Sequence, residues 1–122
     1  DIGTLVSPIK DTSEINDSNI VKAQVEEDLN NKSFVKVSDF FREKKDVYNK
    51  KVYHHIGIYA FTSDALTKYV KLPRSKLEIK RNLEQMRAME NNMLVKVGLV
   101  EGTPLGVDTQ EDLEKINKEM IL

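Results

Sequence analysis

The stretch Tyr53 to Phe61, YHHIGIYAF, decides the fold class of this chain. It is rich in aromatic and β-branched residues and is followed by Thr62-Ser63, a composition that is typical of a β-strand. Side chains alternate between the two faces of a strand. One face therefore carries Tyr53, His55, Gly57, Tyr59 and Phe61, and the other, which we expect to face the core, carries Ile56, Ile58 and Ala60.

His55 and Tyr59 suggest a ligand site on the first face. At the usual rise of a strand they lie about 13 Å apart, and Gly57 between them has no side chain, so a ligand could occupy the gap. The alternative is that both side chains satisfy hydrogen bonds at the sheet surface and that Gly57 permits a bulge. From spacing alone the second interpretation is favoured.

Elements around this strand indicate a mixed α/β architecture built on one sheet. Further strands are predicted over residues 2–6, 20–26, 33–37 and 93–100, and residues 40–51 read as a charged loop. Helices are expected after Thr62-Ser63, after Ser75, where Ser75 and Glu78 match a capping box, and after Thr109. The second helix should bury Ile79, Leu83 and Met86, and the third Leu113, Ile116 and Met120.

Composition excludes several classes of function. The 122 residues contain 19 basic and 20 acidic side chains without a basic stripe, so nucleic acid and anionic membranes are not expected partners. No cysteine is present, which rules out disulfides and thiolate chemistry and is compatible with a cytoplasmic location. No apolar run approaches the roughly 20 residues of a membrane span. The chain starts at Asp1 and enters an apolar run at once, which predicts a piece of a larger protein.

Three polar residues near the predicted helices are candidate site residues. Glu84 and Gln85 could present hydrogen-bonding groups from a rigid helix, although a Glu with an Arg one turn later, here Arg87, is common on exposed helix faces. Asp108 follows the predicted strand 105–107 and precedes the cap Thr109. It could help to hold Mg²⁺ in a crevice beyond the strand, or it could cap the helix.

Taken together, the motifs resemble those of one family. In order, they are YHHIGIYAF at 53–61, LPRS at 72–75, Leu77-Glu78, LEQMR at 83–87 and GVDTQEDL at 106–113. They are similar to the C-terminal half of the 3-deoxy-manno-octulosonate cytidylyltransferases, also called CMP-Kdo synthetases, and TLVSPI at 4–9 resembles the segment leading into that half.

The resemblance implies a fold, an activity and a set of site residues. The fold would be the sugar-binding and dimerisation half of a nucleotide-diphospho-sugar transferase, spanning 1–122 without the nucleotide-binding half, so the chain alone is expected to be inactive. The parent protein would be a cytoplasmic homodimer that transfers CMP from CTP to 3-deoxy-D-manno-octulosonate (Kdo) with Mg²⁺, for lipopolysaccharide synthesis. His55, Tyr59, Glu84 and Gln85 would contact Kdo, and Asp108 would bind the metal.

Two departures from the family pattern leave alternatives. The family commonly has a Phe-Ser-Arg element where this chain has Val37-Ser38-Asp39-Phe40, so the contact of that arginine is not expected here. The family's phosphate-binding loop and its first metal-binding Asp are missing, and one carboxylate is a poor Mg²⁺ site. The chain could instead be an association fragment without catalysis, or part of a cytidylyltransferase for another 2-keto sugar acid.

Overall fold

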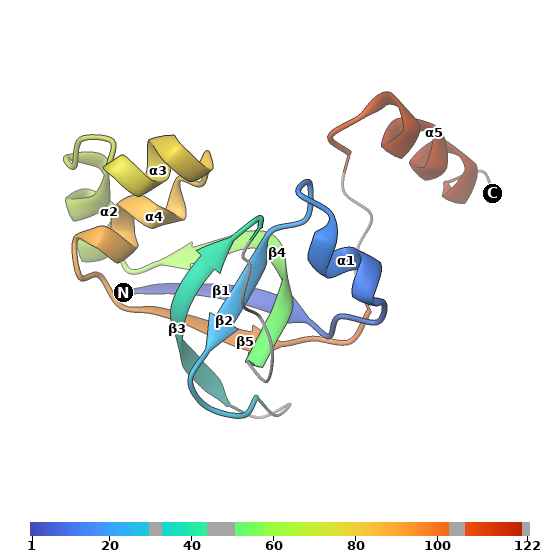
Figure 1. The fold of residues 1–122 in the computed structure, drawn as a ribbon. Coiled ribbons are helices and arrows are strands. Elements are labelled where there is room, and N and C mark those ends of the chain that lie inside the picture. The colour runs from blue at the N-terminus through green and yellow to red at the C-terminus, as the bar shows by residue number, and fades with distance from the viewer. Residues whose placement is uncertain (30–32, 44–50, 103–106, 121–122) are drawn as a thin grey trace.

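The described residues form five strands and five helices, whose arrangement is drawn in Figure 1. The structure is a computed structural model that describes residues 1–29, 33–43, 51–102 and 107–120. The strands are β1 (Ile2–Ser7), β2 (Lys22–Val25), β3 (Phe34–Phe41), β4 (Lys51–Phe61) and β5 (Val95–Leu99). The helices are α1 (Thr12–Asn16), α2 (Ser63–Val70), α3 (Lys76–Arg81), α4 (Gln85–Glu90) and α5 (Gln110–Glu119).

The five strands form one mixed sheet that closes on itself in the order β1-β4-β2-β3-β5. β1 runs parallel to β5, with Ile2 opposite Val95, and the other four pairings are antiparallel. A mixed α/β architecture around one sheet, as predicted, is confirmed. The closure of that sheet into a barrel was not predicted.

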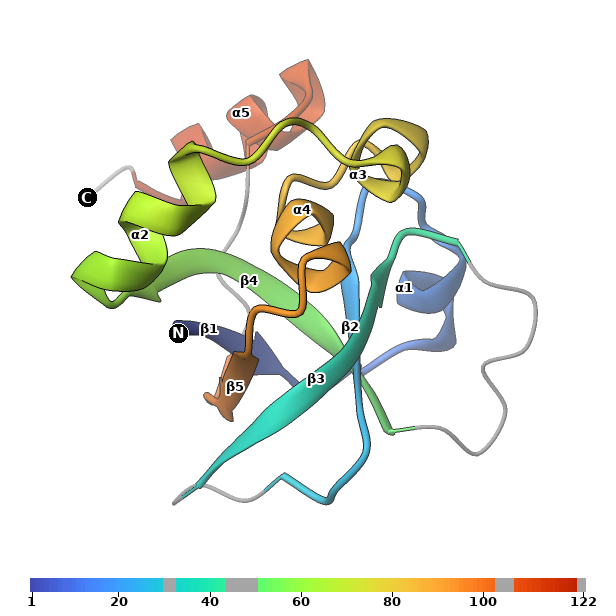
Figure 2. The ribbon, with the colours of Figure 1, turned by 90° about the vertical axis from the view of Figure 1, so that its left-hand side faces the viewer.

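The core fills the inside of the barrel and extends under helix α4. Val6, Ala23, Val37, Phe40 and Val97 are buried within the sheet, and Met86 and Ala88 of α4 join the same cluster. Figure 2 shows α4 lying over the sheet, with α2 and α3 beside it. These three helices all come from the segment between β4 and β5, so one side of the barrel is covered and the site is formed there.

The core face predicted for β4 is wrong. Ile56 is buried, but Ile58 is 62% exposed and Ala60 is exposed too, whereas Tyr59 and Phe61 pack against the core. Opposite β1 the register jumps from Thr4–Tyr59 to Leu5–Ile56, so Gly57 and Ile58 form a bulge. Since the helices cover the face that carries Tyr59 and Phe61, these large rings are partly buried, and the face that carries Ile58 and Ala60 is left outside.

The helix predicted after Ser75 is two helices. Its capping box is confirmed, because the Ser75 Oγ accepts from the Glu78 N–H at 3.2 Å and Glu78 Oε1 accepts from the Ser75 N–H at 3.0 Å. However, α3 ends at Asn82, whose φ of 54° is left-handed. Asn tolerates this conformation better than most residues, so the helical repeat stops there. Leu83 and Met86 are buried as predicted, while Ile79 is 59% exposed.

Helix α5 begins as predicted but does not bury its apolar face. The Thr109 side chain accepts from the Asp112 N–H at 3.1 Å and caps the helix. Leu113 and Met120 are exposed, and Ile116 is half-buried. Residues 105 and 106 of the strand predicted before this helix lie outside the described residues. In the described part of the chain, each helix is too short or too polar to cross a membrane.

Candidate functional site

A pocket of about 250 Å³ opens between the end of β4, helix α2 and the start of α4. Its walls are mostly apolar, and four side chains with polar groups stand in them. The apolar lining comes from Ile2, Phe61, Leu66, Val70, Ala88 and Val95, and the polar groups come from Tyr59, Tyr69, Glu84 and Gln85. Three of the five predicted site residues, Tyr59, Glu84 and Gln85, are therefore brought together here.

A row of aromatic rings leads from the barrel to this pocket. The His55 and Tyr59 ring centroids are 5.5 Å apart, Tyr59 and Phe61 are 6.3 Å apart, and Phe61 and Tyr69 are 5.7 Å apart. Burial raises the pKa of the Tyr59 phenol, and the nearby Glu84 carboxylate raises it further. Tyr59 therefore stays neutral near pH 7, and its hydroxyl can donate a hydrogen bond.

His55 lies behind Tyr59 and is not among the residues that line the pocket. Its ring packs edge-on against Phe40 at 5.1 Å, and its Nε2 lies 2.9 Å from the Thr4 Oγ1. The gap considered for a ligand between His55 and Tyr59 is absent because their rings approach each other, and Gly57 lies in the β4 bulge, as the favoured interpretation held. Burial, followed by the charge of His54, lowers the pKa of His55 to about 4, so the imidazole is neutral near pH 7.

Glu84 and Gln85 stand where α4 begins, and their backbone is anchored from α2. The Tyr69 hydroxyl donates to the Glu84 carbonyl at 2.9 Å. The Glu84 side chain is exposed, whereas Gln85 is 8% exposed and lies against the pocket. Glu84 offers a hydrogen-bond acceptor, and Gln85 offers both a donor and an acceptor.

Arg87 interacts with a different carboxylate from the one that the sequence suggested. Its Nε donates to Glu78 Oε1 at 2.9 Å and one terminal nitrogen donates to Glu78 Oε2 at 2.7 Å. These two hydrogen bonds are the main reason that the pKa of Glu78 falls to about 2. The surface pair expected between Glu84 and Arg87 is thus replaced by a buried pair that joins α3 to α4.

Asp108 does not join the other predicted site residues. Helix α5, which follows it, lies at the opposite end of the molecule from α2, α3 and α4 (Figure 1). The Asp108 N–H donates to Asp112 Oδ2 at 3.1 Å, and the cap is made by Thr109. The alternative to metal binding was that the Asp108 side chain caps the helix. In the structure, Thr109 caps it instead.

A complete magnesium site is not built by the described residues. Nowhere in residues 1–29, 33–43, 51–102 and 107–120 do three His, Cys, Asp or Glu side chains come together in a way that could hold a metal ion. Asp112, the acidic neighbour of Asp108, accepts two backbone N–H groups with Oδ2. Asp108 can therefore provide one ligand, which does not satisfy the six or more oxygen ligands of a hard divalent cation.

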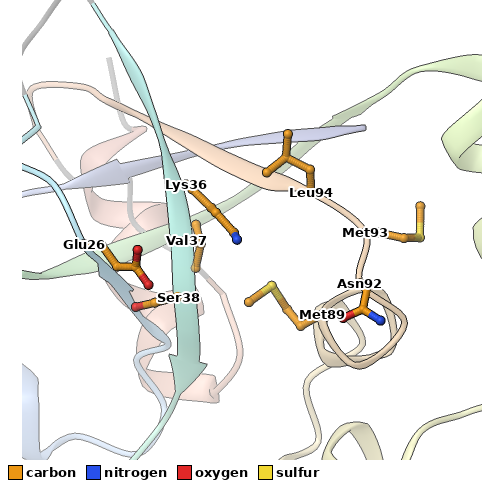
Figure 3. A pocket seen from close by; sticks show the side chains of 8 residues that line it. All are labelled: Glu26, Lys36, Val37, Ser38, Met89, Asn92, Met93 and Leu94. Carbon is orange, nitrogen blue, oxygen red and sulfur yellow. The ribbon is translucent and has the colours of Figure 1, made fainter.

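A second hollow of about 290 Å³ lies between β3 and the turn from α4 into β5 (Figure 3). Lys36, Glu26 and Asn92 contribute its polar groups and are exposed, and Met89 and Leu94 contribute apolar side chains. It contains none of the predicted site residues. We assign it no role, because none of those charged side chains is held in place by burial.

Sequence reasoning missed the residues that support the site. Thr4 sits in an apolar run and gave no signal beyond its polarity, although its hydroxyl meets His55 and the carbonyls of the β4 bulge. Glu78 was recognised as part of a capping box, and because this gave it a local role, its pairing with Arg87 was not predicted. Tyr69 lies in the helix expected after Thr62-Ser63, and its place in the sequence gave no sign that its hydroxyl anchors Glu84.

The closed mixed sheet with helices over one side is an α/β architecture, and the polar-rimmed pocket between them is a candidate site for a small molecule. Residues 1–97 match the family described as cytidylyltransferase, and the chain belongs to that family.

Named relatives agree with this assignment. The 3-deoxy-manno-octulosonate cytidylyltransferase of Bartonella tribocorum is 44% identical over 118 residues, which are 97% of this chain and 48% of the relative. That of Parvibaculum lavamentivorans is 40% identical over 115 residues, 94% of this chain and 44% of the relative. A solved structure of CMP:2-keto-3-deoxy-manno-octonic acid synthetase complexed with CTP matches with a TM-score of 0.78 and 30% identity, covering 98% of this chain and 48% of that one. The chain spans about half the length of the curated relatives it matches.

Proposed function

We propose that the protein to which this chain belongs transfers CMP from CTP to Kdo and releases pyrophosphate. The family match over residues 1–97 is the observation that carries this proposal. The names of the relatives supply the sugar acid, and CTP is bound in the similar solved structure. The chemistry is attack of a sugar hydroxyl on the α-phosphate of CTP, a reaction promoted mainly by positioning and electrostatics.

Within that reaction, we propose that this chain is the C-terminal, sugar-binding half. The order of its motifs supports this placement. In the pocket, the neutral Tyr59 phenol would donate to the acid, Glu84 would accept from a sugar hydroxyl and Gln85 would do both. His55 would act through Tyr59, against which its ring packs, and the direct contact of His55 with Kdo stays a prediction.

The pocket is suited to hydroxyl groups better than to a carboxylate. Among its lining residues none is positively charged, and Glu84 would repel an anion. We propose that the carboxylate of the sugar acid is held by a cation from outside this pocket, in the half of the protein that the chain does not include. The isolated chain should then bind the acid weakly and turn over no substrate.

For the metal, we propose that Asp108 provides one Mg²⁺ ligand and that the other ligands come from outside the described residues. When bound, Mg²⁺ would neutralise phosphate charge. We further propose a cytoplasmic homodimer. The exposed apolar side chains of α5, Leu113 and Met120, are available for contacts between subunits.

The test is release of pyrophosphate from CTP with Mg²⁺ and a series of acids. The full-length protein and this chain alone are each given Kdo, an amino-substituted Kdo and a sialic acid. Turnover of the full-length protein with Kdo, and none by the chain alone, is expected. Turnover with another acid in place of Kdo changes the substrate in the proposal, and absence of turnover with every acid contradicts it and favours an association role.

A further inference from the structure

Glu78 is a buried carboxylate with an unusually complete set of partners. It is 3% exposed and lies in the first turn of α3. Its two oxygens accept from the Ser75 N–H at 3.0 Å and from two nitrogens of Arg87 at 2.9 and 2.7 Å, and the Arg74 Nε lies 3.7 Å away. A fork-to-fork pair of this kind fixes direction as well as distance, so the guanidinium of Arg87 is held in one orientation.

That orientation places Arg87 over the ring of Tyr69. The guanidinium carbon lies 4.8 Å from the ring centroid, within the range of a cation–π contact. The Tyr69 hydroxyl in turn donates to the Glu84 carbonyl, which also accepts from the backbone N–H of Arg87 at 3.2 Å. The contacts therefore join Glu78 of α3 to Arg87 of α4 and Arg87 to Tyr69 of α2. Tyr69 in turn contacts Glu84 at the start of α4.

These contacts end at Glu84, which with Gln85 forms part of the polar lining of the pocket. Glu84 starts α4 without a side-chain cap of its own, and Asn82, two residues earlier, is left-handed. The backbone departs from regular helix at Asn82, just before Glu84 and Gln85, and the Tyr69 hydroxyl ties the Glu84 carbonyl to another element, α2. Glu78 and Arg87 are not among the residues that line the pocket.

We propose that Glu78, Arg87 and Tyr69 form a positioning unit that sets where Glu84 and Gln85 stand in the pocket and thereby sets the affinity for the sugar acid. This inference rests on the proposed function. None of the three is assigned a chemical step. A purely structural role for the buried pair would change stability alone, whereas a positioning role also changes recognition of one substrate.

Kinetics of the full-length protein distinguish these roles. The variants are Glu78→Gln, which keeps the shape of the side chain and removes its charge, Tyr69→Phe, which keeps the ring and removes the hydroxyl, and the double variant. Both variants act on Glu84 and Gln85 through the hydrogen bond from the Tyr69 hydroxyl to the Glu84 carbonyl. Loss of that neutral hydrogen bond corresponds to about a threefold to tenfold weaker interaction, so each single variant should raise the KM for the sugar acid by about that factor. The kcat and the KM for CTP should stay within about twofold.

The double variant tests whether the effects of Glu78→Gln and Tyr69→Phe on the KM for the acid depend on each other. If the residues act as a unit, the double variant should raise the KM for the acid by clearly less than the product of the two single effects. Tyr53→Phe is the matched control, since Tyr53 is a half-buried tyrosine of β4 outside the pocket, and it should leave the KM for the acid unchanged. An unchanged KM in both single variants, or a parallel loss of all kinetic parameters, overturns the proposal.

A second measurement on the present chain needs no substrate. In ¹H–¹⁵N NMR spectra, Glu78→Gln should shift the backbone amide signals of Glu84 and Gln85 and the side-chain amide of Gln85, although six or more residues separate them in sequence. Unchanged Glu84 and Gln85 signals overturn the positioning unit even if the full-length protein turns over no sugar acid. Shifted signals together with absent turnover contradict the proposed function instead.

Discussion

The Oγ1 of Thr4 lies 2.9 Å from the Nε2 of His55, across 51 residues of sequence, and the same oxygen also lies within hydrogen-bonding distance of the Ile56 and Ile58 carbonyls. One hydroxyl in β1 therefore meets both the buried imidazole and the bulge of β4. Because His55 supports the ring of Tyr59, this contact links the centre of the sheet to the pocket.

Replacing Thr4 by Val should destabilise the protein by about 2 kcal/mol. Val has a similar volume, but it leaves the imidazole nitrogen and the bulge carbonyls without their buried partner. Urea unfolding at pH 7.5 measures the change. Thr67→Val serves as the control, because the Thr67 hydroxyl binds a carbonyl on an exposed turn of α2, and a similar loss in both variants would contradict a special role for Thr4.

His55 should make stability depend on pH between about 6.5 and 4. Its pKa is lowered to about 4 in the folded protein, so between these values the unfolded chain binds a proton that the native protein does not. The contribution of His55 to the free energy of unfolding is fully present above pH 6.5. The free energy of unfolding should fall by roughly 3 kcal/mol as the pH drops to 4. The measurement is urea unfolding at pH 7.5 and 4.5 for wild type and His55→Gln. Equal pH dependence in the two proteins would show that His55 is not the titrating group.

Arg87→Met should lower the free energy of unfolding by about 3 kcal/mol, since it leaves the Glu78 carboxylate buried without its main partner. Arg74→Met is the matched control, because Arg74 is largely exposed and lies 3.7 Å from the same oxygen, and it should cost about 0.5 kcal/mol or less. Thermal unfolding of both variants at pH 7 gives the comparison. Equal losses of stability in the two variants would mean that solvent, not Arg87, stabilises the charge of the Glu78 carboxylate.

Acid should weaken the same contact. The pKa of Glu78 is lowered to about 2, so its contribution is present above the ordinary carboxyl pKa near 4.5 and is lost as the pH falls toward 2. Glu78→Gln should remove this part of the acid transition. Unfolding followed by circular dichroism from pH 5 to pH 2 would test it, and an unchanged acid slope in the variant would contradict the assignment.

Asp108→Asn in the full-length protein should reduce turnover by at least about a hundredfold with little change in stability, if this carboxylate is a metal ligand. The helix is capped by Thr109, so the melting temperature should change by about 2 °C or less. Turnover is measured at saturating CTP over a Mg²⁺ titration. Intact turnover with a melting temperature lowered by many degrees would assign Asp108 to the fold.

The end of α3 allows a paired test of the core. Leu83→Ala should cost about 3 kcal/mol, because Leu83 is buried in the main cluster. Ile79→Ala, at a position predicted as buried but found exposed, should cost about 0.5 kcal/mol or less. Urea unfolding of the two variants decides between one continuous helix and the break at Asn82.

The sequence allowed the elements to be predicted better than their faces. Capping at Ser75 and Thr109 depends on short-range hydrogen bonds, and both caps were located correctly. The face of β4 was assigned wrongly because periodicity shows that two faces differ but not which one the helices will cover. The bulge at Gly57 was weighed as an alternative, and the two-residue register jump that places it comes from pairing with distant β1.

The candidate site was predicted in part for the same reason. Tyr59, Glu84 and Gln85 come together after the break at Asn82. An Asn that follows basic residues is a local signal for the end of a helix, but that signal does not give the direction in which α4 continues. The supporting pair Glu78–Arg87 spans nine residues, more than the three or four that join neighbours on a helix, so helical spacing rules could not reveal it.

The closed sheet has a consequence for how the chain folds. β1 is made before the other four strands, yet its neighbour β5 follows about ninety residues later, with the Ile2 N–H donating to the Leu94 carbonyl. Pairing across such a separation is slow, because the chain loses the entropy of the closed loop before the contacts between the strands stabilise it. Until β5 emerges, β1 and β3 each keep an open edge that can pair with other chains. Aggregation during synthesis should therefore be most severe for chains that stop just short of Val95.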